Sequence, residues 1–231
     1  MFSYWDKPDL TPVATFLSEW RLRFPDFTIL GDPQVESIIK ELFPQYLEMY
    51  RAVRIPACKS DIAIALGLYQ FGGLFVDCHC GVRDADAVRR LLTYLDQWEI
   101  ILYDRSRVEE PRSIGDLFPL NSVLFARPNS SIMLRVAANG FRNLVAHRRR
   151  EQERGFEPYD IWSLTGPGNL ADTMLVSESS AWLRPEYLGK ILFIDEGEQN
   201  PVARYTHYSY RQPDMHWSER QQHELLFDDA A

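Results

Sequence analysis

The pattern of apolar and polar positions is clearest in the segment that ends at Asp77. Apolar residues first recur at helical spacing, at Ile62, Ala65, Leu66 and Tyr69. Gly72 and Gly73 follow, and glycine in this place is typical of the left-handed end of a helix. Residues 74–76 are then apolar without a break, as expected of a strand that helices cover on both faces. The pattern predicts a helix over residues 60–71 and a central buried strand at residues 74–76.

Further helices and strands follow from the same kind of pattern. Helix starts are predicted where an acidic or hydroxyl N-cap stands before an apolar periodicity, with proline in the first turn of two of them: Asp9 or Thr11 with Pro12, Asp32 with Pro33, and Asp84 or Asp86. Residues 27–30 and 99–103 are predicted strands. The alternation of helices and strands predicts a single α/β domain over residues 1–231, with a mixed, mostly parallel sheet between helices.

Asp77 stands at the point where the buried strand ends. Ligands of α/β sheets bind at the carboxyl ends of strands, because loops there can change without disturbing the core. The position therefore predicts a metal-binding or phosphate-binding role for Asp77. A helix, a glycine pair and a strand also follow one another in α/β proteins with no site at this point, and the spacing alone leaves both interpretations open.

Composition narrows the class of protein. The chain has 231 residues, of which 45% are hydrophobic, and a net charge of −8. Nucleic acid is excluded as an expected partner, because binding phosphate backbones requires a basic surface. No stretch approaches the roughly 20 apolar residues of a membrane span, and the N-terminus lacks the pattern of a secretion signal. We expect a cytoplasmic protein with no transmembrane segment.

Three cysteines, Cys58, Cys78 and Cys80, raise the question of zinc. His79 lies between the last two, and thiolates and imidazole are zinc ligands. Structural zinc sites use cysteine pairs with a different spacing, and the chain has no second pair. The cysteines are therefore predicted to be reduced thiols.

The segment from Ser60 to His79 resembles the core pattern of the glycosyltransferase sugar-binding region with a DXD motif, S-D-(I/L)-x-R-x(3)-L-x(3)-G-G-(I/V)-Y-(L/V)-D-x-D. Ser60, Asp61, Leu68, Gly72, Gly73 and Asp77 stand at the pattern's positions, and Phe75 replaces its tyrosine. That family includes yeast-type initiating α-mannosyltransferases and bacterial capsular and lipopolysaccharide sugar transferases, and the clostridial glucosylating toxins are similar.

Weaker similarities occur along the rest of the chain in the family's order. They are Phe2 to Trp5, Trp20 to Phe27, Asn121-Ser122 with Arg127-Pro128, Thr165-Gly166-Pro167, His207, and His216-Trp217. Two positions depart from the pattern. Ile64 stands where the family has arginine, and His79 stands where it has the second aspartate of the DXD motif.

The resemblance implies a GT-A fold and a set of site residues. Asp61 and Asp77 would be the catalytic residues, with Asp61 holding hydroxyls of the donor sugar. The implied donor-binding residues are Trp5, which would stack on the base, and Ser60, Asp61, Gly72, Gly73 and Asn121. The implied metal ligands are Asp77, His79 and His207. The implied cofactor is a divalent metal, Mn²⁺ or Mg²⁺, and imidazole at His79 would shift the preference towards a softer ion.

The activity implied by the resemblance is transfer of a hexose, with retention of configuration, from a UDP-sugar or GDP-mannose. The acceptor would be a sugar hydroxyl in polysaccharide or glycolipid synthesis. Ile64 and His79 keep open a catalytically impaired module that binds a sugar nucleotide or a partner. An effector-like protein glycosyltransferase, which differs in its acceptor, is a third possibility.

One basic cluster, Arg148, Arg149 and Arg150, has two interpretations. It could contact the inner face of an anionic membrane, which would suit a lipid-linked acceptor. Such a run is also typical of the solvated face or the C-terminal end of a helix.

Overall fold

A computed structural model describes residues 1–104, 119–176, 183–195, 200–204 and 216–228. In these ranges, six strands form one sheet in the order β2-β1-β3-β6-β5-β7. The strands are β1 (Phe2–Tyr4), β2 (Thr28–Leu30), β3 (Gly73–Val76), β5 (Ile100–Asp104), β6 (Pro119–Ala126) and β7 (Ile191–Asp195). β4 (Cys80–Val82) and β8 (Val202–Arg204) form a separate antiparallel pair.

The sheet is mixed and mostly parallel. β1 pairs in parallel with β2 and β3, and β5 pairs in parallel with β7. β6 runs antiparallel to both of its neighbours, with Leu74 opposite Phe125 and Val76 opposite Val123. The predicted central strand is confirmed, because residues 74–76 are 0% exposed and lie inside the sheet.

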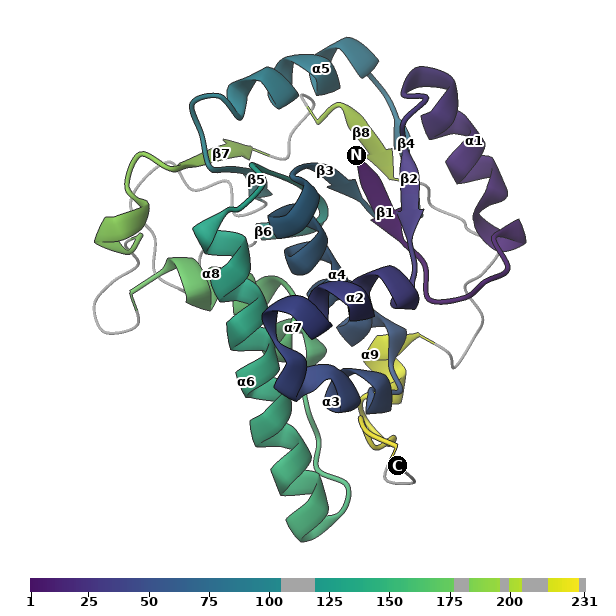
Figure 1. The fold of residues 1–231 in the computed structure, drawn as a ribbon, viewed down its shortest axis with the longest axis vertical. Helices are drawn as coiled ribbons and strands as arrows, with labels where there is room; N and C mark the ends of the chain where they lie inside the picture. The colour runs from purple at the N-terminus through teal and green to yellow at the C-terminus, as the bar shows by residue number, and fades with distance from the viewer. Residues whose placement is uncertain (105–118, 177–182, 196–199, 205–215, 229–231) are drawn as a thin grey trace.

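Helices cover both faces of the sheet (Figure 1). One face packs against α1 (Ala14–Arg23) and α5 (Ala85–Tyr94), through side chains such as Trp20 and Val88. The other face packs against a larger group of helices: α2 (Asp32–Leu42), α3 (Leu47–Ala52), α4 (Pro56–Phe71), α6 (Ser131–Arg154), α7 (Ile161–Leu164) and α8 (Pro167–Met174). The predicted α/β architecture, with a sheet between helices, is confirmed.

The helix before β3 begins earlier than the sequence pattern predicts. α4 starts at Pro56, whose fixed φ suits the first turn, and its apolar face is buried from Cys58 onwards. Asp61 therefore lies on the side of the helix, inside its second turn, instead of at its N-terminus. At the other end, Gly72 adopts φ +62° and its N–H bonds Leu68 O at 2.9 Å, as predicted for a glycine cap.

Two predicted N-caps have different outcomes. Asp84 caps α5, where its side chain accepts hydrogen bonds from the N–H groups of Asp86 and Ala87. Asp32 is not a cap, because Gly31 holds that position and Asp32 is the first residue of α2. The Asp32 carboxylate instead accepts hydrogen bonds from side chains of other elements, described below with the candidate site.

The C-terminal segment 216–228, which begins with α9 (Trp217–Arg220), packs back onto α6. Glu151 of α6 is 3% exposed, and its carboxylate accepts the N–H of Leu226 at 2.7 Å and that of Phe227 at 3.3 Å. His147 Nε2 lies 3.0 Å from Glu151 Oε1. Because burial favours the neutral imidazole, the pKa of His147 is lowered although Glu151 opposes the change. A buried carboxylate thus holds the end of the described chain.

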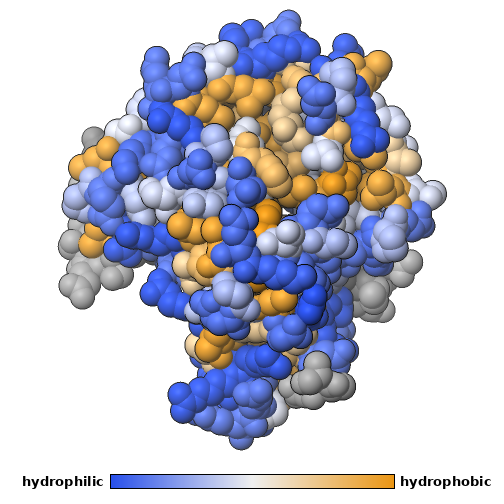
Figure 2. Space-filling model, viewed as in Figure 1, coloured by the Kyte–Doolittle hydropathy of each residue, from blue (hydrophilic) through white to orange (hydrophobic). Residues whose placement is uncertain are grey.

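The end of α6 projects from the body of the molecule and is mainly hydrophilic on the face that Figure 2 shows. Arg149 and Arg150 lie there and pair with Glu153 at 2.8 Å and Glu157 at 3.3 Å. The Arg148 guanidinium lies over the ring of Phe227, 5.6 Å from its centre. The cluster thus lies on a helix, in its C-terminal half, and membrane contact through it stays a prediction. In the described ranges no helix is both long and apolar enough to cross a membrane.

Candidate functional site

The candidate site lies where β3 ends and the antiparallel β6 begins. Asp77 follows the last residue of β3, and its N–H donates to Ser122 O of β6 at 2.9 Å. The start of β6 therefore meets the carboxyl end of β3. Because one strand runs against the others, side chains from the beginning of a strand reach the edge of the sheet where ligands bind.

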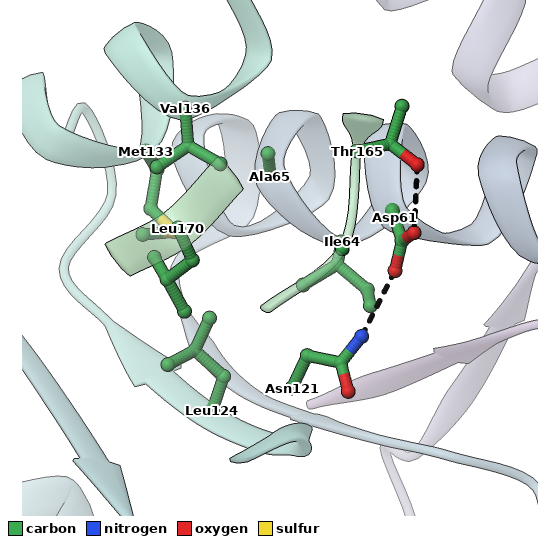
Figure 3. A pocket seen from close by; sticks show the side chains of 10 residues that line it. Asp61, Ile64, Ala65, Asn121, Leu124, Met133, Val136, Thr165 and Leu170 are labelled. Carbon is green, nitrogen blue, oxygen red and sulfur yellow. Dashed lines mark hydrogen bonds between the residues drawn. The ribbon is translucent and has the colours of Figure 1, made fainter. Parts of the chain in front are cut away.

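Asp61 joins this edge from α4 and connects three distant parts of the chain (Figure 3). Its Oδ1 accepts a hydrogen bond from Asn121 Nδ2 at 2.9 Å, across 60 residues of sequence. Its Oδ2 accepts one from Thr165 Oγ1 at 2.8 Å, across 104 residues. A carboxylate has about four lone-pair positions, so each oxygen can still accept a hydrogen bond from a ligand.

The environment of Asp61 changes its acidity. Burial raises the pKa of Asp61 to about 7, and the negative charge of Asp77 nearby contributes to the increase. The hydrogen bonds from Thr165 and Asn121 oppose it, because they favour the ionised form. A carboxyl group that changes its charge near neutral pH at the end of a central strand is a candidate functional residue.

Asp61, Asn121 and Thr165 lie at one end of a small cavity (Figure 3). The cavity has a volume of about 20 Å³, and with its open mouth the space between the walls is about 270 Å³. The rest of its wall is apolar, formed by Ile64, Ala65, Leu124, Met133, Val136 and Leu170, with Gly166 beside Thr165. Ile64 is part of this apolar wall, and it stands at the position where the DXD-type glycosyltransferase pattern has arginine.

Asp77 and His79 form the other polar part of the site. His79 Nδ1 lies 3.8 Å from Asp77 Oδ2, and both side chains are partly exposed. Burial raises the pKa of Asp77, while His79 acts in the opposite direction. In the described ranges no cluster of three or more His, Cys, Asp or Glu side chains is placed to hold a metal ion. His207, the third implied ligand, lies outside the described residues.

Asp77 and His79 would suit a divalent metal that takes its remaining ligands from the substrate and from water. Mg²⁺ and similar ions at phosphate-binding sites are often held by only one or two protein side chains, and the substrate's phosphates and water complete the shell. Asp77 offers an oxygen and His79 a nitrogen, a donor set that suits Mn²⁺ or a softer ion better than Mg²⁺. These two residues would hold such a metal.

Trp5 follows β1 directly and is partly buried. Its Nε1 donates to Asp9 O at 2.9 Å, which fixes the indole beside the chain entering α1. The turn after β3 packs against the end of β1, where Cys78 Sγ lies 3.1 Å from Ser3 Oγ. Trp5 thus lies near Asp77 in the fold but does not line the cavity. Ser60 is partly buried on α4, next to Asp61.

Gly72 and Gly73 lie apart from the other candidate residues, and their assignment as donor-binding residues stays a prediction. They lie at the start of β3, whereas Asp77 follows its end. A Cβ at Gly72 would lie 2.5 Å from the ring of Pro128, and both glycines have positive φ. Their presence is explained by the helix end and the close packing of β3 against the loop after β6.

A second polar cluster lies beside the site, around Asp32. The hydroxyls of Tyr4 and Tyr50 donate to Asp32 Oδ1 at 2.5 and 2.8 Å, and Lys59 Nζ donates to Oδ2 at 2.9 Å. Burial would raise the pKa of Asp32, but these hydrogen bonds outweigh it and lower the pKa. Lys59, two positions before Asp61 on α4, is therefore held by Asp32 and Tyr50 on another side of that helix.

Thr165 belongs to this site but is not among the site residues assigned from the sequence. It matches the family's T-G-P segment, but that match alone gives no partner for its hydroxyl. Thr165 follows α7, and Gly166 and Pro167 start α8 immediately after it. From this junction between the two helices the Thr165 hydroxyl donates to Asp61. Its signal in the sequence is the position of T-G-P, and its partner is visible only in the fold.

Comparison with known proteins gives little. No family model matches the chain, and no curated protein matches it. One of the matching solved structures is titled PaToxG Glycosyltransferase; it shares 12% sequence identity at a TM-score of 0.40. The alignment covers 75% of this chain and 66% of that one, so the chain spans just under two thirds of that structure. At this TM-score the likeness assigns no family and no activity.

Proposed function

We propose that this protein is a glycosyltransferase of the GT-A type that transfers a hexose from a nucleotide-diphosphate sugar. The observation that carries the proposal is the convergence of Asp61, Asn121 and Thr165 on one cavity. Each belongs to a separate segment that resembles a motif of such transferases, and Asp77 lies close enough to raise the pKa of Asp61. Separate motifs meeting at the ligand-binding edge of a sheet are expected of a shared site.

The roles follow from the positions of the side chains. Asp61 would accept hydrogen bonds from hydroxyls of the donor sugar, and Asn121 and Thr165 orient its carboxylate. Asp77 and His79 would hold a divalent metal that binds the diphosphate, and Trp5 would stack on the base. A bound metal supplies positive charge that stabilises the diphosphate as it leaves. The protein's contribution would then be orientation of the donor and stabilisation of charge.

Retention of configuration fits a site of this kind. In front-face attack the leaving phosphate accepts the proton of the acceptor hydroxyl, so no separate general base is required. The donor would be a UDP-sugar or GDP-mannose, and the acceptor a sugar hydroxyl of a polysaccharide or glycolipid. A cytoplasmic enzyme that contacts the membrane through Arg148, Arg149 and Arg150 could reach a lipid-linked acceptor. A protein acceptor would make it an effector-like transferase.

A second candidate function is a module of the same fold that binds a sugar nucleotide without transferring the sugar. It is favoured by the replacement of a cation by Ile64 in the cavity wall and of a carboxylate by His79 beside Asp77. Both changes remove charge that would act on the donor. The two functions share the site and differ in turnover.

The test is donor hydrolysis, measured for UDP- and GDP-sugars with Mg²⁺, Mn²⁺, Co²⁺ and Zn²⁺. Transferase activity should depend on metal and be lost in Asp61→Ala and Asp77→Ala, and a matched change at the exposed Asp96, Asp96→Ala, should retain it. Donor binding that requires Asp61 but gives no hydrolysis with any metal would select the binding module. If no donor binds, both functions are wrong.

A further inference from the structure

The cavity beside Asp61 is polar at one end only. Asp61, Asn121 and Thr165 form that end, and their hydrogen-bonding groups are joined to one another. The remaining side chains of the wall are aliphatic or the thioether of Met133, and they come from four elements: α4, β6, α6 and α8 (Figure 3). The polar end can hold a hydroxyl, and the remainder of the cavity cannot.

The size of the cavity limits what can enter it. Its volume of about 20 Å³ accommodates a group of the size of a methyl or one water molecule. A pyranose ring does not fit inside and would lie in the open mouth, where Asp61 is accessible. One substituent of the sugar would then point towards Ile64, Leu124 and Val136.

We infer that the donor sugar carries a methyl group, either as a 6-deoxyhexose or as an N-acetylhexosamine, and that this methyl occupies the apolar cavity while a hydroxyl of the ring donates to Asp61. The inference rests on the proposed function and specifies its substrate class. Removing a methyl from water into an aliphatic cavity is favourable. A hydroxymethyl group in the same place would leave its hydroxyl without a hydrogen-bond partner, which is unfavourable.

The experiment compares donors that differ at this group and share a nucleotide. Isothermal titration calorimetry with Mn²⁺ would measure UDP-N-acetylglucosamine against UDP-glucose, and GDP-6-deoxymannose against GDP-mannose. The methyl-bearing donor of at least one pair should bind about tenfold more tightly or better, the range expected for a hydrophobic pocket. The pair that shows the preference identifies the source of the methyl, acetamido or 6-deoxy.

A cavity-filling variant links the preference to this cavity. Ala65→Val adds bulk to the wall, so the affinity ratio within the preferred pair should fall towards one. Ala146→Val makes the same change on the exposed side of α6, and its ratio should equal that of the parent. Thermal unfolding would verify that both variants are folded.

Saturation-transfer NMR on the unaltered protein is an independent measurement, which decides the matter if Ala65→Val does not fold. The methyl protons of the bound donor should receive more saturation than its ring protons, since side-chain protons of Ile64, Leu124 and Val136 would surround them.

Three results would overturn the inference. One is equal or tighter binding of the hydroxyl-bearing donor in both pairs. Another is an affinity ratio within the preferred donor pair that is the same in folded Ala65→Val as in the parent. A third is saturation of the donor's methyl protons that is weaker than that of its ring protons. Each of these leaves the proposed function standing, because donors still bind. If none of the four donors binds, the proposed function fails and the inference fails with it.

Discussion

Replacing Asp61 with asparagine should stabilise the folded protein above pH 7 while weakening recognition of the donor sugar. Asparagine has nearly the shape of the protonated carboxyl and carries no charge to bury. The unfolded chain releases the Asp61 proton near the ordinary pKa of 3.8, whereas the folded protein retains it up to about pH 7. Between these values the folded state binds more protons, so the stability of the parent protein decreases as pH rises.

The size of this effect follows from the difference in pKa. A change from 3.8 to about 7 corresponds to about 4 kcal/mol at most, at about 1.4 kcal/mol per pH unit. Part of the Asp61 side chain is accessible to solvent, which screens its charge, and we expect about half of that limit, about 2 kcal/mol. For a domain of this size the difference corresponds to a rise in melting temperature of about 4–8 °C.

Urea unfolding of the parent and Asp61→Asn at pH 5 and pH 8 would measure the effect. At pH 5, which lies above the ordinary pKa of 3.8, part of the effect is already present, so the variant should gain about 0.8 kcal/mol there and about 2 kcal/mol at pH 8. Asp96→Asn, at an exposed carboxylate, should show no such difference between the two pH values. A variant that is equally destabilised at both pH values would refute the reasoning, since it would show that Asp61 is ionised and favourably paired throughout.

Three further predictions concern the proposed metal ligands and the C-terminal segment. His79→Asp should strengthen Mn²⁺-dependent binding of UDP or GDP in calorimetry, because a carboxylate replaces a neutral imidazole; unchanged binding would mean that residue 79 does not contact the metal. Asp77→Ala should remove the dependence of nucleotide affinity on metal, and an affinity that still rises with Mn²⁺ would place the metal elsewhere. Glu151→Gln should lower the free energy of unfolding in urea by about 1–3 kcal/mol, because the two carboxylate oxygens accept the N–H groups of Leu226 and Phe227 and the amide replaces one of these oxygens with a donor. Amide hydrogen exchange at these two residues should accelerate. Exchange rates equal to those of the parent would contradict that role of Glu151.

The elements that the sequence predicts well are those specified by nearby residues. The apolar run at residues 74–76 can only be buried on both faces, and the glycine pair before it ends the helix locally. Asp84 caps α5 through N–H groups two and three positions away, so its role is visible in the sequence. In each case the interaction partner lies within a few residues.

The predictions that failed depend on distant partners. Asp32 has the sequence context of an N-cap, but its carboxylate binds Tyr4, Tyr50 and Lys59, which the fold brings from other elements. The close approach of Gly72 to Pro128 likewise depends on a distant part of the chain and is not visible in the sequence around the glycine. The pairing of Thr165 with Asp61 could not be predicted, because neither residue's surroundings in the sequence specify a partner so far away.

The way in which the candidate site is assembled has a consequence for folding. Its polar residues belong to segments separated by 60 and 104 positions, so a chain synthesised only as far as α6 cannot form it. Under the proposed function, no early folding intermediate that lacks the Thr165 segment would bind the donor with native affinity. A donor at 100 times its dissociation constant should therefore stabilise the complete fold by about 2.7 kcal/mol and leave partly folded chains unaffected. Under the proposed function, donor added to a cell-free lysate would then rescue destabilised variants by stabilising their native state, without accelerating the steps that lead to it.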